Sequence, residues 1–194
     1  MDLQERSYST LIVSASSKFN QALPEIFPVS SFFPINKVSD ISTAKRAVAA
    51  REFDIVVVNS PLPDDAGIRF AIDTVDSGST VVLFIAGAET FDDVNDRLTR
   101  SGVFVMRRPA SINLFLAAAS WLVSARERLR KTEKKTLSIE EKMNEIRLVN
   151  RAKWLLISEL KMTEPDAHRY IEKQAMDRCV SKRVVSEEII KTYG

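Results

Sequence analysis

Two short apolar runs constrain the fold of this chain more than any other feature. DIVVVN (54–59) and TVVLFIA (80–86) are continuously apolar and rich in β-branched residues, as is typical of parallel strands buried on both faces. Three further strands are predicted, at 9–14, 32–38 and 103–106. Helical segments alternate with the strands, at 17–23, 40–53, 64–76, 90–100 and from 112 onward. This alternation predicts an α/β domain, a mostly parallel five-stranded sheet with helices on both faces.

Two prolines refine these boundaries. Pro24 is expected to end the first helix, because a proline inside a helix removes a hydrogen bond and clashes with the preceding turn. Pro34 restricts its strand to a sheet edge or to a strand start, since proline cannot donate to the ladder.

A long helix is predicted from Ile112 to Leu160, a stretch without glycine or proline. Its apolar residues recur at near-heptad spacing, which favours a coiled coil between two chains. The predicted dimer seam consists of Leu122, Leu129, Ile139, Met143 and Ile146, with Ala125 beside it. Thr132 and Thr136 interrupt the seam, so a surface helix with a linker near 131–138 is the alternative.

The last third of the chain predicts a small three-helix cluster. Thr163 starts a helix as its cap, with Pro165 in the first turn, and this helix should run to about Cys179. A final helix should start at Ser181 or Lys182 and end near Tyr193.

Charge is distributed unevenly along the chain. Residues 1–120 hold 11 Lys and Arg against 14 Asp and Glu, whereas residues 121–194 hold 17 against 12. A polyanionic partner is therefore expected on the C-terminal side, although a basic helix surface can also be simply solvated.

Several classes of protein are disfavoured. No apolar run approaches the ~18 residues of a membrane span, and residues 1–10 do not resemble a secretory signal. Cys179, the only cysteine, excludes an internal disulfide and any multi-cysteine zinc site, which favours a reducing, cytoplasmic location. His168 has no partner in the sequence for a metal site, and phosphate-binding glycine motifs are absent. We predict no cofactor, no metal, no membrane association and no enzymatic activity.

The order and spacing of the first strands and helices resemble response-regulator receiver domains, which are flavodoxin-like, over about residues 8–123. In that family the third strand ends in a phosphate-accepting aspartate, an acidic pair after the first strand holds Mg²⁺, and a hydroxyl and a lysine end the fourth and fifth strands. This chain has a different residue at each of these positions. Asn59 stands at the acceptor position, and Ser14 and Ala15 stand at the acidic pair. Ile85 or Ala86 falls at the hydroxyl position, and Arg108-Pro109 replaces the lysine and its following proline.

These substitutions predict a receiver without its chemistry. An amide such as Asn59 is too poor a nucleophile to accept a phosphoryl group, and a hard cation lacks its carboxylate ligands. Asp64 and Asp65 are the remaining nearby acids. We favour a turn and a helix cap for them over a rebuilt acidic site. Control is then expected from a partner protein, a ligand or expression level rather than from phosphorylation of this domain.

Residues 140–194 resemble an ANTAR domain. The motifs are Asn150-Arg151-Ala152-Lys153 with Leu155-Leu156-Ile157, then Thr163 to Ala167, Tyr170-Ile171, Gln174-Ala175-Met176, and Val184, Ile189 and Ile190. The family usually has glycine where this chain has Trp154. The resemblance implies an RNA-binding transcription antiterminator, whose dimer binds paired hairpins in a leader transcript.

The candidate RNA-binding residues lie on the predicted outer helix faces. They are Arg151, Lys153, Thr163, Arg169, Tyr170, Lys173 and Gln174, because cations contact phosphates and aromatic or amide side chains contact unpaired bases. A core is expected from Ile146, Leu155, Leu156, Ala167, Ile171, Ala175, Ile189 and Ile190.

The predicted domains are a receiver-like domain at 1–123, a coiled-coil linker at 124–139 and an ANTAR domain at 140–194. Two other functions stay open. One is an interaction protein that sequesters partners without RNA. The other is a DNA-binding regulator, against which Glu187 and Glu188 in the last helix count.

Overall fold

The computed structural model describes residues 6–194. The first five residues of the predicted receiver-like domain lie outside this description. The chain forms two compact units, Met1–Lys131 (unit 1) and Thr132–Gly194 (unit 2). Each unit contains part of α5, a single helix from Ile112 to Leu160.

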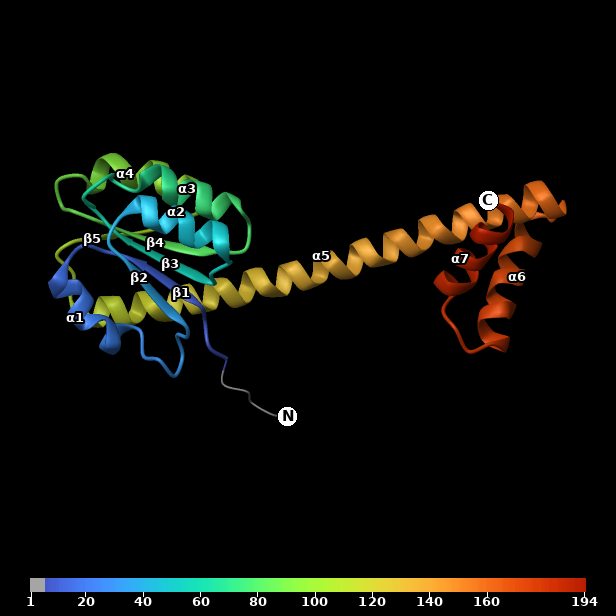
Figure 1. Ribbon diagram of the computed structural model, residues 1–194, viewed down its shortest axis with the longest axis horizontal. Helices are drawn as coiled ribbons and strands as arrows, with labels where there is room; N and C mark the ends of the chain where they lie inside the picture. Colours follow the sequence, from blue (N-terminus) through green and yellow to red (C-terminus); the bar gives the residue numbers. More distant parts are fainter. Residues whose placement is uncertain (1–5) are drawn as a thin grey trace. The chain divides into compact units, whose positions relative to one another are not determined.

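Unit 1 contains five strands in one parallel sheet, as predicted (Figure 1). The strands are β1 (Thr10–Val13), β2 (Ile35–Val38), β3 (Ile55–Asn59), β4 (Val81–Ala86) and β5 (Phe104–Arg107). The helices between them are α1 (Ser17–Ile26), α2 (Ile41–Ala50), α3 (Ile68–Asp76) and α4 (Phe91–Arg100). The strand order is β2-β1-β3-β4-β5, the flavodoxin-like order. Pro34 directly precedes β2, which is an edge strand.

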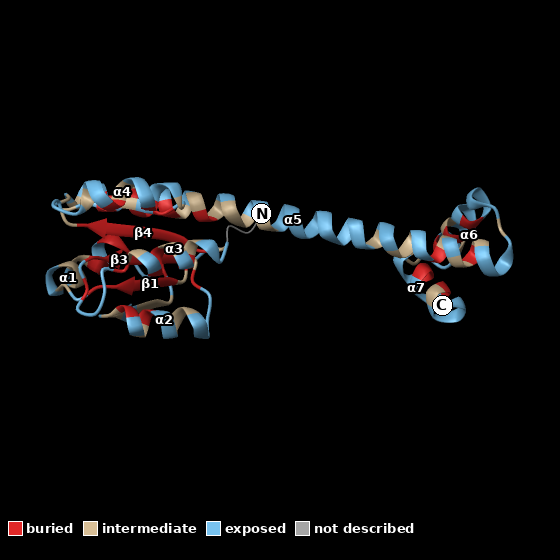
Figure 2. Ribbon diagram, turned by 90° about the horizontal axis from the view of Figure 1, so that it is seen from above, coloured by how far each residue is buried: buried red, intermediate tan, exposed pale blue. Residues whose placement is uncertain are grey.

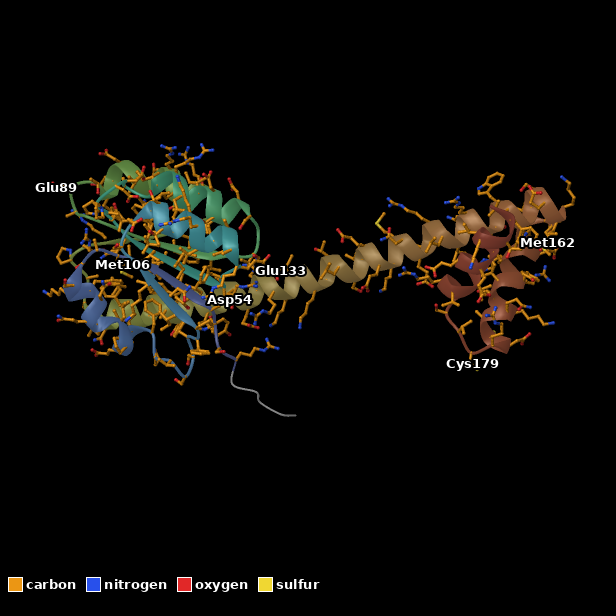
Figure 3. The ribbon with its side chains drawn as sticks, viewed as in Figure 1. Asp54, Glu89, Met106, Glu133, Met162 and Cys179 are labelled. Atoms are coloured by element: carbon orange, nitrogen blue, oxygen red, sulfur yellow. The ribbon has the colours of Figure 1, made fainter. Side chains whose placement is uncertain are left out.

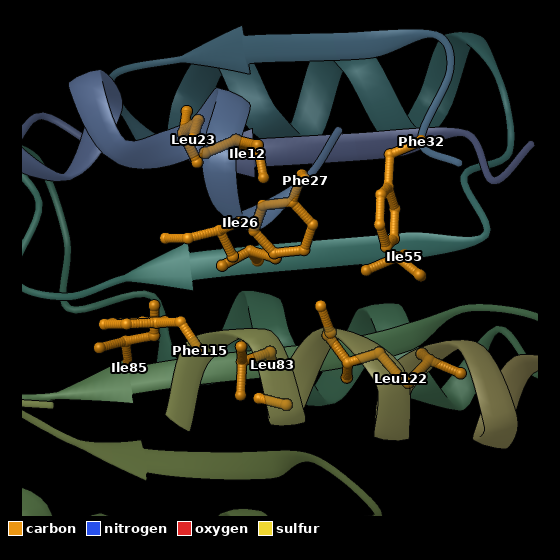
Figure 4. Packing of buried hydrophobic residues seen from close by; sticks show 14 of the residues in the cluster. Ile12, Leu23, Ile26, Phe27, Phe32, Ile55, Leu83, Ile85, Phe115 and Leu122 are labelled. Atoms are coloured by element: carbon orange, nitrogen blue, oxygen red, sulfur yellow. The ribbon is translucent and has the colours of Figure 1, made fainter. Parts of the chain in front are cut away.

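Each face of the sheet has its own apolar core, because successive strand residues point to opposite faces. Ile55 and Val57 of β3 contribute to the core beneath α1 and the start of α5 (Figure 4). Val56 and Val58 contribute to the core beneath α2, α3 and α4. The central strands β1, β3 and β4 are therefore wholly buried, whereas the edge strands β2 and β5 are partly exposed and the helices expose their outer faces (Figure 2).

The predicted dimer seam needs correction at its first two residues, Leu122 and Leu129. Leu122 is 1% exposed within the first of these cores, where it lies near Leu83 (Figure 4). Leu129 and Ala125 are partly buried against the same core. The start of α5 covers its own sheet, so Leu122 cannot form a seam with a second chain, and Leu129 already packs partly against the same core.

Two helix boundaries differ from the prediction. α1 continues past Pro24 to Ile26, and the Phe27 N–H still donates to the Leu23 carbonyl oxygen, so the proline lies inside the last turn without ending the helix. α3 begins at Ile68 rather than at Asp64, since Gly67 before it adopts a left-handed φ of 79°. A Cβ at Gly67 would also lie 2.9 Å from Val58 Cγ1, so the glycine allows a close approach to β3.

An ion-pair cluster attaches α5 to the start of β3. Asp54 Oδ1 accepts hydrogen bonds from Arg126 Nε at 2.8 Å and Arg130 Nη2 at 2.9 Å. Asp54 Oδ2 accepts from the backbone N–H and the hydroxyl of Ser9 at 2.9 and 3.0 Å. The side chains of Asp54 and Arg126 are only 15% and 10% exposed, and Figure 3 shows Asp54 beside α5. Both carboxylate oxygens are therefore satisfied close to the core.

Unit 2 is the predicted three-helix cluster. The end of α5 packs with α6 (Glu164–Asp177) and α7 (Lys182–Tyr193). Its core consists of Ala152, Leu156, Ala167, Ile171, Ala175, Val185 and Ile189. Leu155 and Ile190 are partly buried against it, but Ile146 is 59% exposed and does not belong to this core.

Candidate nucleic-acid interface

The phosphoacceptor position of unit 1 holds an amide and, within residues 6–194, has no carboxylate bonded to it. Asn59, at the end of β3, is buried and donates from Nδ2 to Ser14 Oγ at 3.0 Å. Arg108, at the lysine position, donates from Nη2 to the carbonyl oxygen of Ser60. These contacts connect the carboxyl ends of β1, β3 and β5 without a carboxylate.

Asp64 and Asp65 serve as caps and turn residues. Asp64 accepts hydrogen bonds from the N–H groups of Ile41 and Ser42, both at 2.9 Å, and these bonds lower its carboxyl pKa. Asp65 accepts from the Gly67 N–H at 2.6 Å. Asp64 thus caps α2, not the helix that follows it in the chain. Among residues 6–194, no cluster of three or more His, Cys, Asp and Glu side chains could hold a metal ion.

Thr163 has a structural role at the start of α6. Its hydroxyl accepts a hydrogen bond from the Asp166 N–H at 3.3 Å and donates to Asp166 Oδ2 at 2.6 Å. This is the cap predicted from the sequence, and it occupies the hydroxyl that was also a candidate for RNA contact.

Thr163→Ala should reduce the stability of the first turn of α6 by about 1 kcal/mol, because the Asp166 N–H loses its acceptor. Hydrogen exchange of the α6 amides in the full-length chain measures this loss. Thr163→Ser should retain the cap. Thr192→Ala, which removes a hydroxyl bonded within α7, is the control. Equal exchange in Thr163→Ala and the wild type would contradict the capping role.

Lys153 and Arg151 lie on different sides of α5. Residues two apart on a helix point about 200° from each other. Lys153 is largely buried and pairs with Glu164 at 2.7 Å, and this hydrogen bond lowers the pKa of Glu164. Arg151 is exposed. The two cations of the ANTAR motif therefore do not form one patch.

Arg169 and Lys173 lie together on the exposed face of α6. They lie four residues apart on the exposed face, opposite Ile171. Arg169 Nη2 lies 3.8 Å from Asp166 Oδ1, a weak exposed pair. Tyr170 is 39% exposed, and Gln174 is partly buried. Arg169, Lys173 and Tyr170 are thus accessible, as expected for RNA contact, and Gln174 is less so.

Net charge supports a polyanion partner less than the sequence suggested. Residues 132–194 hold 13 Lys and Arg against 11 Asp and Glu, because part of the basic excess belongs to unit 1, where Arg126 and Arg130 contact Asp54. In unit 2, ion pairs no longer than 2.8 Å occupy four cations, in Lys153–Glu164, Lys182–Glu172, Arg178–Glu188 and Arg183–Glu187. Any RNA site thus depends on the remaining cations.

The sequence prediction omitted Arg147 and gave Trp154 no role. Trp154 is 71% exposed, and Arg147 lies on the same side of α5, also exposed. The exposure of these two side chains is what identifies them as candidates. It can be predicted from the sequence only when the buried face of α5 is known.

Exposed apolar residues extend along one face of α5. Ile139, Met143 and Ile146 are 48%, 50% and 59% exposed and follow the i, i+4, i+7 spacing of a single helix face. These three residues retain the geometry expected of a seam. Among residues 6–194, no helix is long and apolar enough to cross a membrane.

Comparison with known proteins gives a family match in unit 2 and a relative that spans almost the whole chain. Residues 138–190 match the ANTAR domain family. The transcriptional regulatory protein PdtaR of Mycobacterium tuberculosis (strain CDC 1551 / Oshkosh) is 24% identical over 184 residues, or 95% of this chain and 90% of that protein.

Solved structures match with low identity and show the fold alone. The signal receiver domain of an HD domain-containing protein from Pseudomonas fluorescens Pf-5 has a TM-score of 0.57 and 17% identity, covering 68% of this chain and 96% of that one. NtrX from Brucella abortus also reaches 0.57, at 14% identity, but the match covers 66% of this chain and only 29% of NtrX. The predicted combination of a receiver fold and an ANTAR domain is confirmed.

Proposed function

We propose that this chain, a regulator of the antiterminator type that joins a receiver fold to an ANTAR domain, binds paired RNA hairpins in leader transcripts as a homodimer. The observation that carries the proposal is the ANTAR match over residues 138–190, which covers most of unit 2. Accessible Arg151, Arg169 and Lys173 support it, because Lys and Arg side chains contact the phosphates of RNA.

Dimerisation would occur through Ile139, Met143 and Ile146. Their exposed face has no apolar cover within the described chain, and a second α5 supplies the matching face. A dimer carries two RNA sites, so the second hairpin binds at a high effective concentration. Affinity for paired hairpins then depends on the dimer.

Control by phosphorylation of unit 1 is not part of the proposal. Asn59 is an amide held by Ser14, and Asp64 is engaged in capping α2. We propose that a partner protein or ligand, or the amount of the protein, sets the activity.

A gel-shift titration of the full-length protein tests this function. A two-hairpin leader RNA, a single-hairpin version and a duplex DNA of equal charge are compared at one salt concentration, because salt sets nonspecific binding. Preference for the two-hairpin RNA supports the proposal. Equal, weak binding to all three across leaders of the protein's own operon contradicts it.

Reversing a charge on α6 should weaken RNA binding. Lys173→Glu is expected to lower the affinity for the two-hairpin RNA about tenfold and to reduce the salt dependence, because one phosphate contact is lost. Lys134→Glu is the matched control, since Lys134 is also exposed but lies outside the ANTAR match. Equal losses in both variants would indicate a general charge effect rather than a site.

A groove on unit 1 favours a second candidate, the interaction module without RNA. The groove measures about 360 Å³, and Phe104, Leu114 and Trp121 beside it are partly exposed. A chain that bound a partner protein but none of the RNAs would fit this candidate. A DNA-binding role is less favoured, because Glu187 and Glu188 of α7 pair with Arg183 and Arg178.

A further inference from the structure

Trp154 is the most exposed aromatic side chain among residues 6–194, at 71%. It lies on the side of α5 away from Ala152 and Leu156, which form the core of unit 2. The ANTAR resemblance has glycine here, so the indole is a feature of this chain. An apolar ring held in solvent is costly, and a ligand that covered it would recover that cost.

The neighbours of the ring are cationic and polar. Asn150 and Arg151 precede Trp154 by four and three residues, and Arg147 precedes Arg151 by four, so all lie on one face. All three are exposed.

The two arginines are available for an external anion. Within residues 6–194, neither Arg147 nor Arg151 has an ion pair or a side-chain hydrogen bond, and no acidic residue lies three or four positions from either. Like charges four residues apart oppose helix formation. A bound polyanion would relieve that repulsion.

We infer that Trp154 is a stacking platform for an unpaired base of an RNA hairpin loop, with Arg147 and Arg151 on the adjacent phosphates. Indole rings stack on any base, and guanidinium groups bind phosphate oxygens in forked geometry. The Asn150 amide can both donate to and accept from a base edge. This inference rests on the proposed function and adds a site to it.

A second copy of the chain is the less favoured occupant. The apolar face of Ile139, Met143 and Ile146 continues toward Trp154, but Arg147 and Arg151 flank its end. Symmetric pairing of two helices in register would bring the arginines of both copies together, and like charges oppose such contact. The apolar seam therefore ends at Ile146.

Substitution of the two tryptophans tests the platform. Trp154→Ala should weaken binding to a hairpin RNA with an unpaired loop by between about 5-fold and about 150-fold. Trp154→Phe, which keeps a stacking ring, should restore most of the affinity. Trp121→Ala is the control, because Trp121 is 54% exposed but lies in unit 1. The affinity of Trp121→Ala for the hairpin RNA should equal that of the wild type.

Fluorescence gives a second readout in the full-length Trp121→Phe variant, whose remaining tryptophan is Trp154. The hairpin RNA should quench this emission, whereas the same stem as a blunt duplex without a loop should not. Sedimentation of Trp154→Ala without RNA should show the same dimer as the wild type.

The results distinguish failure of the Trp154 platform from failure of the proposed RNA-binding function. If the wild type binds the hairpin RNA, Trp154→Ala binds it with the same affinity and the RNA does not quench Trp154 emission, the platform is overturned. The proposed function is then unaffected. Loss of the dimer in Trp154→Ala overturns it in favour of a second copy. Failure of the wild type to bind any hairpin RNA overturns the inference together with the function.

Discussion

Ile146→Glu is expected to abolish dimerisation and to weaken binding of the two-hairpin RNA by about 100-fold or more. The substitution places a charge at the C-terminal end of the proposed seam, one turn from Met143, where a second copy would have to bury it. Loss of the dimer removes the effective concentration that links the two hairpins. Sedimentation equilibrium and the gel shift measure the two effects.

Leu137→Glu is the matched control for this variant. Leu137 has the same 59% exposure as Ile146 and lies on the same helix, but on another face. It should remain dimeric and bind normally. A dimeric Ile146→Glu protein, or equal loss in both variants, would contradict the seam. Affinity for a single hairpin should change little in either variant.

Asp54→Ala should lower the free energy of unfolding of unit 1 by about 3–5 kcal/mol. It removes the carboxylate that nearly buried Arg126 contacts, one acceptor of Arg130, and the acceptor of the Ser9 N–H and hydroxyl. Hydrogen exchange of the β1 and β3 amides measures the change. Asp73→Ala removes the exposed Arg69–Asp73 pair, and should cost no more than about 0.5 kcal/mol. A similar small loss in Asp54→Ala would contradict the role of the cluster.

The contribution of Asp54 should also depend on pH. Burial alone would raise its pKa, but hydrogen bonds from Ser9 and Arg126 outweigh burial and lower the pKa below its ordinary value of 3.8. A lowered pKa means that the stabilisation is complete above 3.8 and is lost as pH falls through the folded-state pKa. The difference between wild type and Asp54→Ala should therefore shrink in strong acid.

Local sequence patterns predicted the order of strands and helices, because most of these elements have a strong local cause. The apolar run of β3 and the cap at Thr163 both lie where the sequence placed them. The heptad pattern failed at Leu122 because an apolar helix face looks the same whether it covers its own sheet or a second chain.

Long-range contacts limited what could be predicted of the site. Asp64 caps a helix more than 20 residues earlier in the chain, and Lys153 pairs with Glu164 on the next helix. Both partners are set by tertiary packing, which spacing alone does not reveal. Lys173 and Arg169 are accessible as predicted. The apolar spacing of their own helix is enough to place them on its outer face.

The middle of α5 has a consequence for the lifetime of the protein. Every residue from Lys134 to Asn144 is exposed, so helix hydrogen bonds hold this segment without packing against the rest of the described chain, and such segments open at low cost. Local unfolding would therefore start there and present Lys134, Lys135 and Lys142 to proteases. If the seam closes on a second copy, the same segment is protected. The amount of chain in the cell would then influence its own rate of degradation, with single copies removed first and paired copies spared.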